Sequence, residues 1–297
     1  MTGEPMTGEP MKAVRLAGRS ASQRTFVRLL GAPGAFAGCA VIALVLVLAA
    51  FAPLLAPYDW NATSQCRRLA PISAEHWFGC DLFGRDLLSR VMGGARYSLG
   101  MGVSTVTISV VFGALLGVSI GYGGGWVDKL GARLIDALLC FPPIILAILI
   151  VAVLGVGLWN AALAVGISGI PRFARIARAA TLSVASRDFV EAARSIGAGS
   201  PRIVLRHLLP NLAPVLIVLS TLDLGAAVLF TATLSFLGLG AQPPTPEWGA
   251  MLNAGREYVR YAPWTMIFPG LALFLTVMAV NLVGDRLSTV LDPRQRS

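Results

Sequence analysis

The sequence predicts an all-α, polytopic membrane protein with six transmembrane helices. Hydrophobic residues make up 56% of the 297 residues and charged residues 13%, roughly half the charged fraction of an average soluble domain. A water-soluble fold of this size would lack the surface charge that keeps it solvated. Several long uncharged runs can each form a helix across a hydrocarbon core of about 30 Å. These observations exclude both a soluble enzyme and an intrinsically disordered chain.

The uncharged runs define the order of the helices. Gly155 and Gly157 divide one long run into two helices joined by a short turn. We expect Pro142 and Pro143 to bend the first helix of that pair, because proline removes a backbone hydrogen bond. The predicted spans lie between 28 and 59, over about 98–121, as a pair within 136–172, over about 213–238 and over about 263–284.

Basic residues divide unequally between the two sides of this bundle. Seventeen of the 24 Lys and Arg residues lie with the termini and the second and fourth loops. Because positively charged loops stay in the cytoplasm, both termini are expected to be cytoplasmic. The predicted organisation is a cytoplasmic tail over 1–30 and a transmembrane domain over 31–297, with an extracytoplasmic loop over 57–96 and a cytoplasmic loop over 185–210. The net charge of +9 follows the membrane, so it does not indicate a nucleic-acid partner.

Glycines recur at every fourth position of the second span, as Gly113, Gly117, Gly121 and Gly125. This spacing gives a smooth helix face on which a neighbouring backbone can approach closely. We expect this face to pack inside the bundle.

Two of the four cysteines, Cys66 and Cys80, fall in the predicted extracytoplasmic loop. Disulfides persist in that compartment, so we predict a bond between them. The alternative is a pair of free thiols. Cys39 and Cys140 lie in apolar helices and behave there as small hydrophobic residues.

No catalytic or metal-binding constellation can be identified from the sequence. His76 and His207 are expected on opposite sides of the membrane, so they cannot share a metal ion or a triad. Neither lysine follows the glycine spacing of a phosphate-binding loop. The chain is therefore not expected to bind ATP, and its energy must come from a partner or an ion gradient.

Asp223 is an exception among the carboxylates, because it lies near the middle of the fifth span. A charge there costs about 2.5–3.5 kcal/mol on insertion scales, so the side chain should face a polar cavity or a partner. A place in the substrate pathway, where it would attract an amine, is one interpretation. A hydrogen bond to a neighbouring helix or a protonated side chain is the other.

The sequence of the fourth loop predicts two short helices with clear ends. We expect Asp188 to cap a helix over 189–196, which Gly197 ends in a left-handed conformation. A second helix is expected to begin with Ser200 as its cap and to end at Pro210. Such a loop is a rigid element and not a flexible connector.

This loop resembles that of the integral permease subunits of ATP-binding cassette importers. The family pattern is Glu-Ala-Ala, Gly and Leu-Pro at fixed spacing, and the chain has Glu191-Ala192-Ala193, Gly197 and Leu209-Pro210 at those places. Arg206-His207 before Leu-Pro is similar to the peptide and nickel branch. Further matches to the second permease type of that branch are His76-Trp77-Phe78-Gly79, Asp81, Gly84-Arg85-Asp86, Ser89-Arg90, Arg133, Asp136, Phe141-Pro142, Glu247-Trp248-Gly249 and Asp292-Pro293, with Cys80 in place of a more frequent threonine.

The resemblance implies a type I importer permease fold and a non-catalytic subunit that forms half of the pathway of an ATP-driven importer of oligopeptides or dipeptides. It implies a bacterial inner membrane location and four kinds of partner: a second permease, two ATPase subunits, an extracytoplasmic peptide-binding protein and the lipid bilayer. ATP and Mg²⁺ would be bound by the ATPases, with no cofactor on this chain. The residues implied in ATPase coupling are Asp188, Glu191, Ala192, Ala193, Gly197, Arg206, His207 and Pro210.

Two alternatives stay open at this point. The same machinery could import nickel, glutathione or another small solute. An ion-coupled carrier or channel is the alternative of another class; it would not need the docking loop and would be expected to show inverted repeats with buried charges.

Overall fold

The computed structural model describes residues 33–291, and within that range it is a bundle of helices without β-strands. The predicted tail over 1–30 lies outside the described residues, as do residues 31–32 and 292–297, which include Asp292 and Pro293. In chain order the elements are α3 (Pro33–Leu55), α4 (Leu87–Gly123), α5 (Gly125–Leu139), α6 (Pro143–Leu154), α7 (Leu158–Ala185), α8 (Asp188–Ser195), α9 (Ser200–Ile203), the π-helical turn Val204–Leu208, α10 (Leu209–Phe236), α11 (Trp248–Gly255), the 3-10 turn Arg256–Tyr258 and α12 (Trp264–Leu291).

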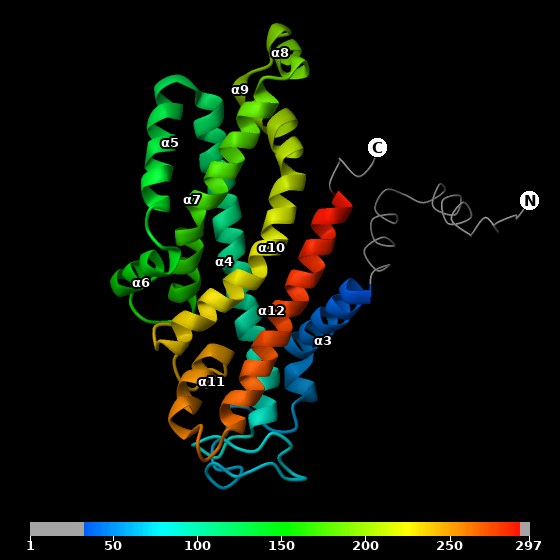
Figure 1. Ribbon diagram of the computed structural model, residues 1–297, viewed down its shortest axis with the longest axis vertical. Helices are drawn as coiled ribbons and strands as arrows, with labels where there is room; N and C mark the ends of the chain where they lie inside the picture. The colour runs from blue at the N-terminus through cyan, green and yellow to red at the C-terminus, as the bar shows by residue number, and fades with distance from the viewer. Residues whose placement is uncertain (1–32, 292–297) are drawn as a thin grey trace, which may run out of the picture.

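The long helices run along the long axis of the molecule, as Figure 1 shows. Helices α8 and α9 project at one end, and the irregular segment between α3 and α4 closes the opposite end together with α11. We refer to these as the α8 end and the loop end. The predicted extracytoplasmic and cytoplasmic loops therefore lie at opposite ends of the bundle.

The predicted count of six spans is not reproduced in the described residues. Four helices are long and apolar enough to cross a membrane: α3, α4, the continuous helix Ser200–Phe236 and α12. The bent pair of α5 and α6 would be a fifth. The 28-residue helix α7 is not among them, because its arginines interrupt its apolar sequence.

The prolines of the predicted third span break that helix completely. Helix α5 ends at Leu139, α6 begins at Pro143, and the two axes differ by 91°; Figure 1 shows α6 lying across the direction of α5. Proline at 142 and 143 cannot donate to the preceding turn, so the helical hydrogen bonds cannot continue. The 12 residues of α6 rise only about 18 Å, less than the hydrocarbon core.

The glycine face of α4 packs against α7, as expected for a face inside the bundle. A Cβ on Gly117 would lie 2.4 Å from the carbonyl oxygen of Ala174, and one on Gly113 would lie 2.5 Å from Cβ of Phe173. Only glycine allows the two backbones to approach this closely. Gly125 is wrong as a member of this face, because α4 ends at Gly123 and nothing lies within 4 Å of a Cβ at 125.

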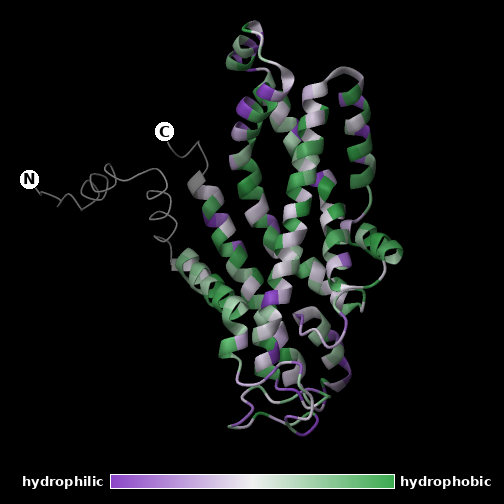
Figure 2. Cartoon of the chain, turned by 180° about the vertical axis from the view of Figure 1, so that it is seen from behind, coloured by the Kyte–Doolittle hydropathy of each residue, from purple (hydrophilic) through white to green (hydrophobic). Residues whose placement is uncertain are grey.

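Apolar side chains cover much of the outside of the helices. Figure 2 shows much green along the helices, with purple both in the segments at the two ends and at single positions along the helices. Leu54 and Val153 are among the large apolar residues that stay exposed. A soluble protein could not tolerate this much exposed apolar surface, so the lateral faces are suited to lipid.

Glu247 fixes α11 to the loop end. Its carboxylate accepts hydrogen bonds from the backbone N–H groups of Gly249 at 2.9 Å and Ala250 at 2.8 Å, and from the Ser98 hydroxyl on α4 at 3.2 Å. Burial raises the pKa of Glu247, and the hydrogen bonds partly oppose this shift. The residue is an N-cap that also joins two helices.

Candidate functional site

The α8 end carries a short helical hairpin, defined here as residues 188–208. Gly197 ends α8 with φ of +81°, the left-handed conformation that the sequence predicted. Its N–H donates to the carbonyl of Arg194 at 2.9 Å, and the N–H of Ala198 donates to the carbonyl of Ala193 at 3.0 Å. These two bonds form a Schellman motif, which satisfies the last carbonyls of α8.

Two predicted caps are wrong. Helix α8 includes Asp188 in its first turn, and its N-cap is Arg187, without a side-chain hydrogen bond. Asp188 therefore acts on the helix through its charge near the N-terminus. Gly199, and not Ser200, is the N-cap of α9. The Ser200 hydroxyl instead lies 3.5 Å from the Tyr122 hydroxyl at the end of α4.

Pro210 does not end the second helix of the hairpin. The chain continues as one helix from Ser200 to Phe236, and the N–H of Leu209 bonds to the carbonyl of Val204, five residues earlier. This π-helical turn lies immediately before Pro210, which lacks an N–H and would clash with the carbonyl four residues back in an α-helix. Arg206 and His207 lie within the turn.

Buried residues join the hairpin to the bundle. Val190 on α8, Ile203 on α9 and Leu208 are fully buried in one apolar cluster with Phe173 of α7. Ala193 is also buried, which explains why a small residue is required there. The hairpin is thus an extension of the apolar core.

The opposite face of the hairpin is exposed. Ile196 is 86% exposed, Leu205 67% and Phe189 40%. Glu191, Ala192 and Arg206 are exposed around them, and the His207 ring lies 6.1 Å from that of Phe189. We call Phe189, Glu191, Ala192, Ile196, Leu205 and Arg206 the hairpin face. Exposed apolar side chains rimmed by charges are typical of a protein interface. The exposure of Ile196 and Leu205 was missed, since no pattern in the sequence shows which face of so short a helix is covered.

Asp223 lies in an ion pair that the sequence did not reveal. Its carboxylate on α10 bonds to the guanidinium of Arg172 on α7. The Asp223 side chain is 18% exposed and that of Arg172 is 55% exposed. The charge of Asp223 in an apolar helix therefore has a partner, and its distance along the sequence from Arg172 explains why the pair could not be predicted.

At the loop end, a disulfide joins Cys66 to Cys80, with their Cα atoms 6.6 Å apart. Asp86 caps α4, accepting from the Ser89 N–H at 2.8 Å, and also lies 2.9 Å from Nδ1 of His76. His76 is thus far from His207, which lies at the α8 end. The free cysteines in the described residues are Cys39 and Cys140.

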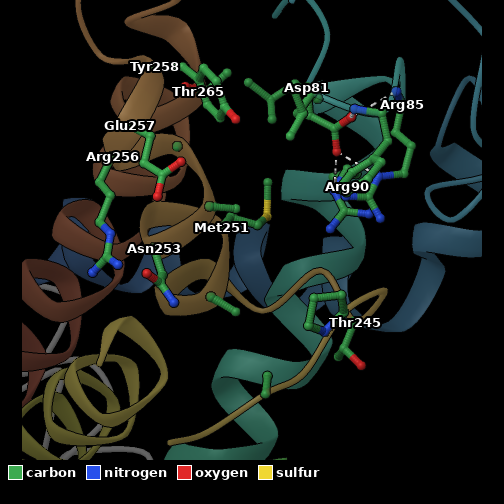
Figure 3. A pocket seen from close by; sticks show the side chains of 18 of the residues that line it. Asp81, Arg85, Arg90, Thr245, Met251, Asn253, Arg256, Glu257, Tyr258 and Thr265 are labelled. Atoms are coloured by element: carbon green, nitrogen blue, oxygen red, sulfur yellow. Dashed lines mark hydrogen bonds and ion pairs between the residues drawn. The ribbon is translucent and has the colours of Figure 1, made fainter. Parts of the chain in front are cut away.

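A pocket of about 400 Å³ opens at the same end, between the segment before α4 and α11. Figure 3 shows Asp81, Arg85 and Arg90 on one side and Met251, Asn253 and Glu257 on the other. Asp81 pairs with Arg85 at 2.6 Å and lies 3.5 Å from Nε of Arg90. One carboxylate thus serves two buried guanidinium groups, so this wall is positively charged.

Comparisons with known proteins agree with this architecture. Residues 110–297 match the family described as binding-protein-dependent transport system inner membrane component, and residues 20–71 match the N-terminal transmembrane domain of oligopeptide transport permease C. The dipeptide transport system permease protein DppC of Alkalihalophilus pseudofirmus is 45% identical over 263 residues, which cover 89% of this chain and 86% of the relative. The glutathione transport system permease protein GsiD of Escherichia coli is 48% identical over 255 residues, 85% of this chain and 84% of the relative.

A solved structure supports the fold. The chain is similar to one in inward facing conformations of the MetNI methionine ABC transporter, with a TM-score of 0.56 and 22% identity, over 69% of this chain and 98% of the other. This likeness concerns the architecture alone.

Proposed function

Because the chain belongs to the family of binding-protein-dependent transport system inner membrane components, we propose that it forms half of the translocation pathway of an ATP-driven importer of short peptides. As a member of this family the chain is a multi-pass permease subunit of the inner membrane and not an enzyme. The energy for transport then comes from ATPase subunits, which would hold ATP and Mg²⁺, with no cofactor on this chain.

The observation that carries the proposal is the hairpin face at the α8 end. Its apolar side chains are exposed, while Val190, Ile203 and Leu208 on the other side of the hairpin are fully buried in the core. A surface that is both exposed to a partner and rigidly joined to the bundle suits the transfer of motion from an ATPase. In this proposal Glu191, Ala192 and Arg206 contact the ATPase, while Ala193 and Gly197 keep the hairpin in shape.

The same proposal places the α8 end in the cytoplasm, with both termini on that side. The loop end would then face outward, where a disulfide persists and a solute-binding protein would dock near the pocket. A second, homologous permease subunit would complete the pathway.

Copurification of the assembled importer tests the docking role. Glu191→Arg reverses a charge on the hairpin face, and we expect it to weaken retention of the ATPase subunits at least about tenfold, the scale of one interface hot spot. Glu75→Arg, at an exposed position of the loop end, makes the same charge change and should leave ATPase retention unchanged. Equal retention in both variants would contradict the docking role.

The substrate is proposed from the relatives. Similarity to a dipeptide permease favours dipeptides as the substrate of this chain. Similarity to a glutathione permease makes glutathione, itself a peptide, the second candidate. Uptake of labelled dipeptides by the reconstituted importer, with glutathione and nickel as competitors, distinguishes them. Strong competition by nickel alone would contradict a peptide substrate.

Asp223 is proposed to face this pathway together with Arg172. The pair offers one negative and one positive group beside each other in apolar surroundings, and Arg172 remains 55% exposed. Such a pair can attract either end of a zwitterionic peptide.

A further inference from the structure

Three potential metal ligands meet at the loop end. One side-chain ligand atom each from Cys66, His76 and Cys80 lies within 4.8 Å of the other two. Cys80 is fully buried, His76 is 6% exposed, and Cys66 is half-buried. The group is therefore largely sheltered, and Cys66 is its most exposed member.

His76 contacts a carboxylate, as metal-binding histidines commonly do. Its Nδ1 lies 2.9 Å from Oδ1 of Asp86, and the other carboxylate oxygen of Asp86 accepts from the Ser89 N–H at 2.8 Å and the Ser89 hydroxyl at 2.7 Å. When the Asp86 carboxylate is the acceptor of this bond, Nδ1 of His76 is its donor. The lone pair is then on Nε2, and the carboxylate fixes the ring, as in carboxylate–histidine–metal sites.

Backbone hydrogen bonds, in addition to the disulfide, connect the segments that carry the two cysteines. The N–H of Cys66 donates to the carbonyl of Gly84 at 3.2 Å, and the N–H of Cys80 donates to the carbonyl of Ala70 at 2.9 Å. Between them, the N–H of Leu69 donates to the carbonyl of Asp81 at 3.0 Å. These bonds should persist when the sulfurs are no longer bonded, so the ligands stay assembled.

We propose that reduction of the Cys66–Cys80 disulfide creates a site for one Zn²⁺ ion, bound by Sγ of Cys66, Sγ of Cys80 and Nε2 of His76. A dithiol reductant supplies two electrons and two protons, the S–S bond breaks, and two thiols form while the reductant becomes a disulfide. Zn²⁺ then displaces the two thiol protons. Thiolate and imidazole are the ligands that Zn²⁺ prefers, and a water molecule fills the fourth position.

The disulfide and the metal ion exclude each other, because both need the same two sulfurs. Each closes the loop between the two cysteines, which are 14 residues apart in the sequence. The ion would keep this loop in shape beside the N-terminus of α4 when a reductant has opened the disulfide.

The test uses the full-length chain in lipid nanodiscs with Cys39→Ser and Cys140→Ser, so that Cys66 and Cys80 are its thiols. After reduction with a phosphine and its removal without oxygen, Co²⁺ is added as the spectroscopic probe. We expect one equivalent of Co²⁺ to give a thiolate charge-transfer band and the visible bands of a tetrahedral site, and Zn²⁺ to abolish both. The oxidised chain should give neither. No spectrum in the reduced chain, or the same spectrum in both, would overturn the proposal.

Two variants assign the ligands. Cys66→Ser should lower the intensity of the thiolate band, because only Cys80 then supplies a sulfur, and His76→Gln should weaken Co²⁺ binding at least tenfold. Because His76→Gln could also disturb the loop, alkylation of the two thiols in the otherwise unaltered site is measured by mass spectrometry. Zn²⁺ should slow it at least tenfold. Equal alkylation rates with and without Zn²⁺ would overturn the proposal, whatever the importer transports.

Discussion

The guanidinium of Arg178 on α7 holds both carboxylate oxygens of Asp128 on α5, at 2.6 Å and 2.7 Å. It is the last of three arginines spaced three residues apart on α7, each paired with an aspartate of another helix: Arg172 with Asp223, Arg175 with Asp136 and Arg178 with Asp128. In the proposed orientation, the preference for positive charge near the cytoplasm explains arginines in general, but these pairs give each one a specific partner. Helix α7 is thus joined by charge to α5 and α10.

The Arg178–Asp128 pair should depend on the forked shape of the guanidinium. Arg178→Lys keeps the charge but loses one of two hydrogen bonds, so the thermal midpoint in nanodiscs should fall less than in Arg178→Gln. Adding Asp128→Asn to Arg178→Gln should cost little more, because the partner is already lost. Additive losses from the two changes would contradict a direct pair.

The contact between α4 and α7 should be intolerant of side chains. A Cβ at Gly117 would lie 2.4 Å from the backbone of Ala174, whereas a Cβ at Gly100 of the same helix would have Trp159 at 3.9 Å as its nearest neighbour. Gly117→Ala should therefore lower the stability by about 1–3 kcal/mol, and Gly100→Ala should be neutral or slightly stabilising. Thermal unfolding of the two variants in matched nanodiscs measures this difference. Equal thermal midpoints would contradict a close backbone contact at Gly117.

Gly197 should be required for its conformation and not for space. Nothing lies within 4 Å of a Cβ at this position, although φ is +81°. Gly197→Ala should cost about 1–2 kcal/mol and reduce the coupling of ATP hydrolysis to uptake. Gly197→Asn, which adopts this conformation more readily, should retain most of the coupling. If Gly197→Ala retained more coupling than Gly197→Asn, the size of the side chain and not the backbone conformation would be the limiting property.

The Arg172–Asp223 pair can be tested by exchanging its charges. Asp223→Asn leaves Arg172 without its partner and should reduce uptake. The double change Arg172→Asp with Asp223→Arg should restore uptake if the pair mainly joins α7 to α10. If Asp223 instead attracts the amine of a peptide, Asp223→Asn should raise the KM for the peptide. The charge exchange should then leave the KM raised and fail to restore uptake.

The raised pKa of Glu247 predicts a pH dependence of stability. Burial favours the neutral carboxyl in the folded state, so the stabilisation from this group is complete below its ordinary pKa of 4.5 and is lost as the pH rises through the raised value. Glu247→Gln is neutral at every pH. The thermal midpoint of the variant should therefore improve relative to the unaltered chain as the pH is raised from 4.5, and a constant difference would contradict the shift.

Local features were predictable from sequence to different degrees. Gly197 and the glycine face of α4 follow from the steric freedom of one residue type; the structure has Gly197 as predicted and the glycine face without Gly125. The caps at Asp188 and Ser200 were wrong because several neighbouring residues can start so short a helix. Pro210 was wrong as a helix end because a π-helical turn removes the clash that proline would otherwise cause.

Features that depend on tertiary contacts were not predictable. Nothing in the sequence connects Asp223 with Arg172, or Asp128 with Arg178, since each pair joins residues 50 or 51 positions apart on separate helices. The same holds for the exposure of Ile196. Its apolar side chain is typical of a buried position, and only the arrangement of the hairpin leaves it uncovered.

The most direct test of the hairpin face is ATP-driven uptake by the complete importer in proteoliposomes carrying Ile196→Asp, with Ile196→Leu as the matched control. At equal amounts of inserted chain, we predict that Ile196→Asp lowers uptake at least about tenfold while Ile196→Leu transports at the unaltered rate. Undiminished uptake by Ile196→Asp would show that an ATPase does not act through this face.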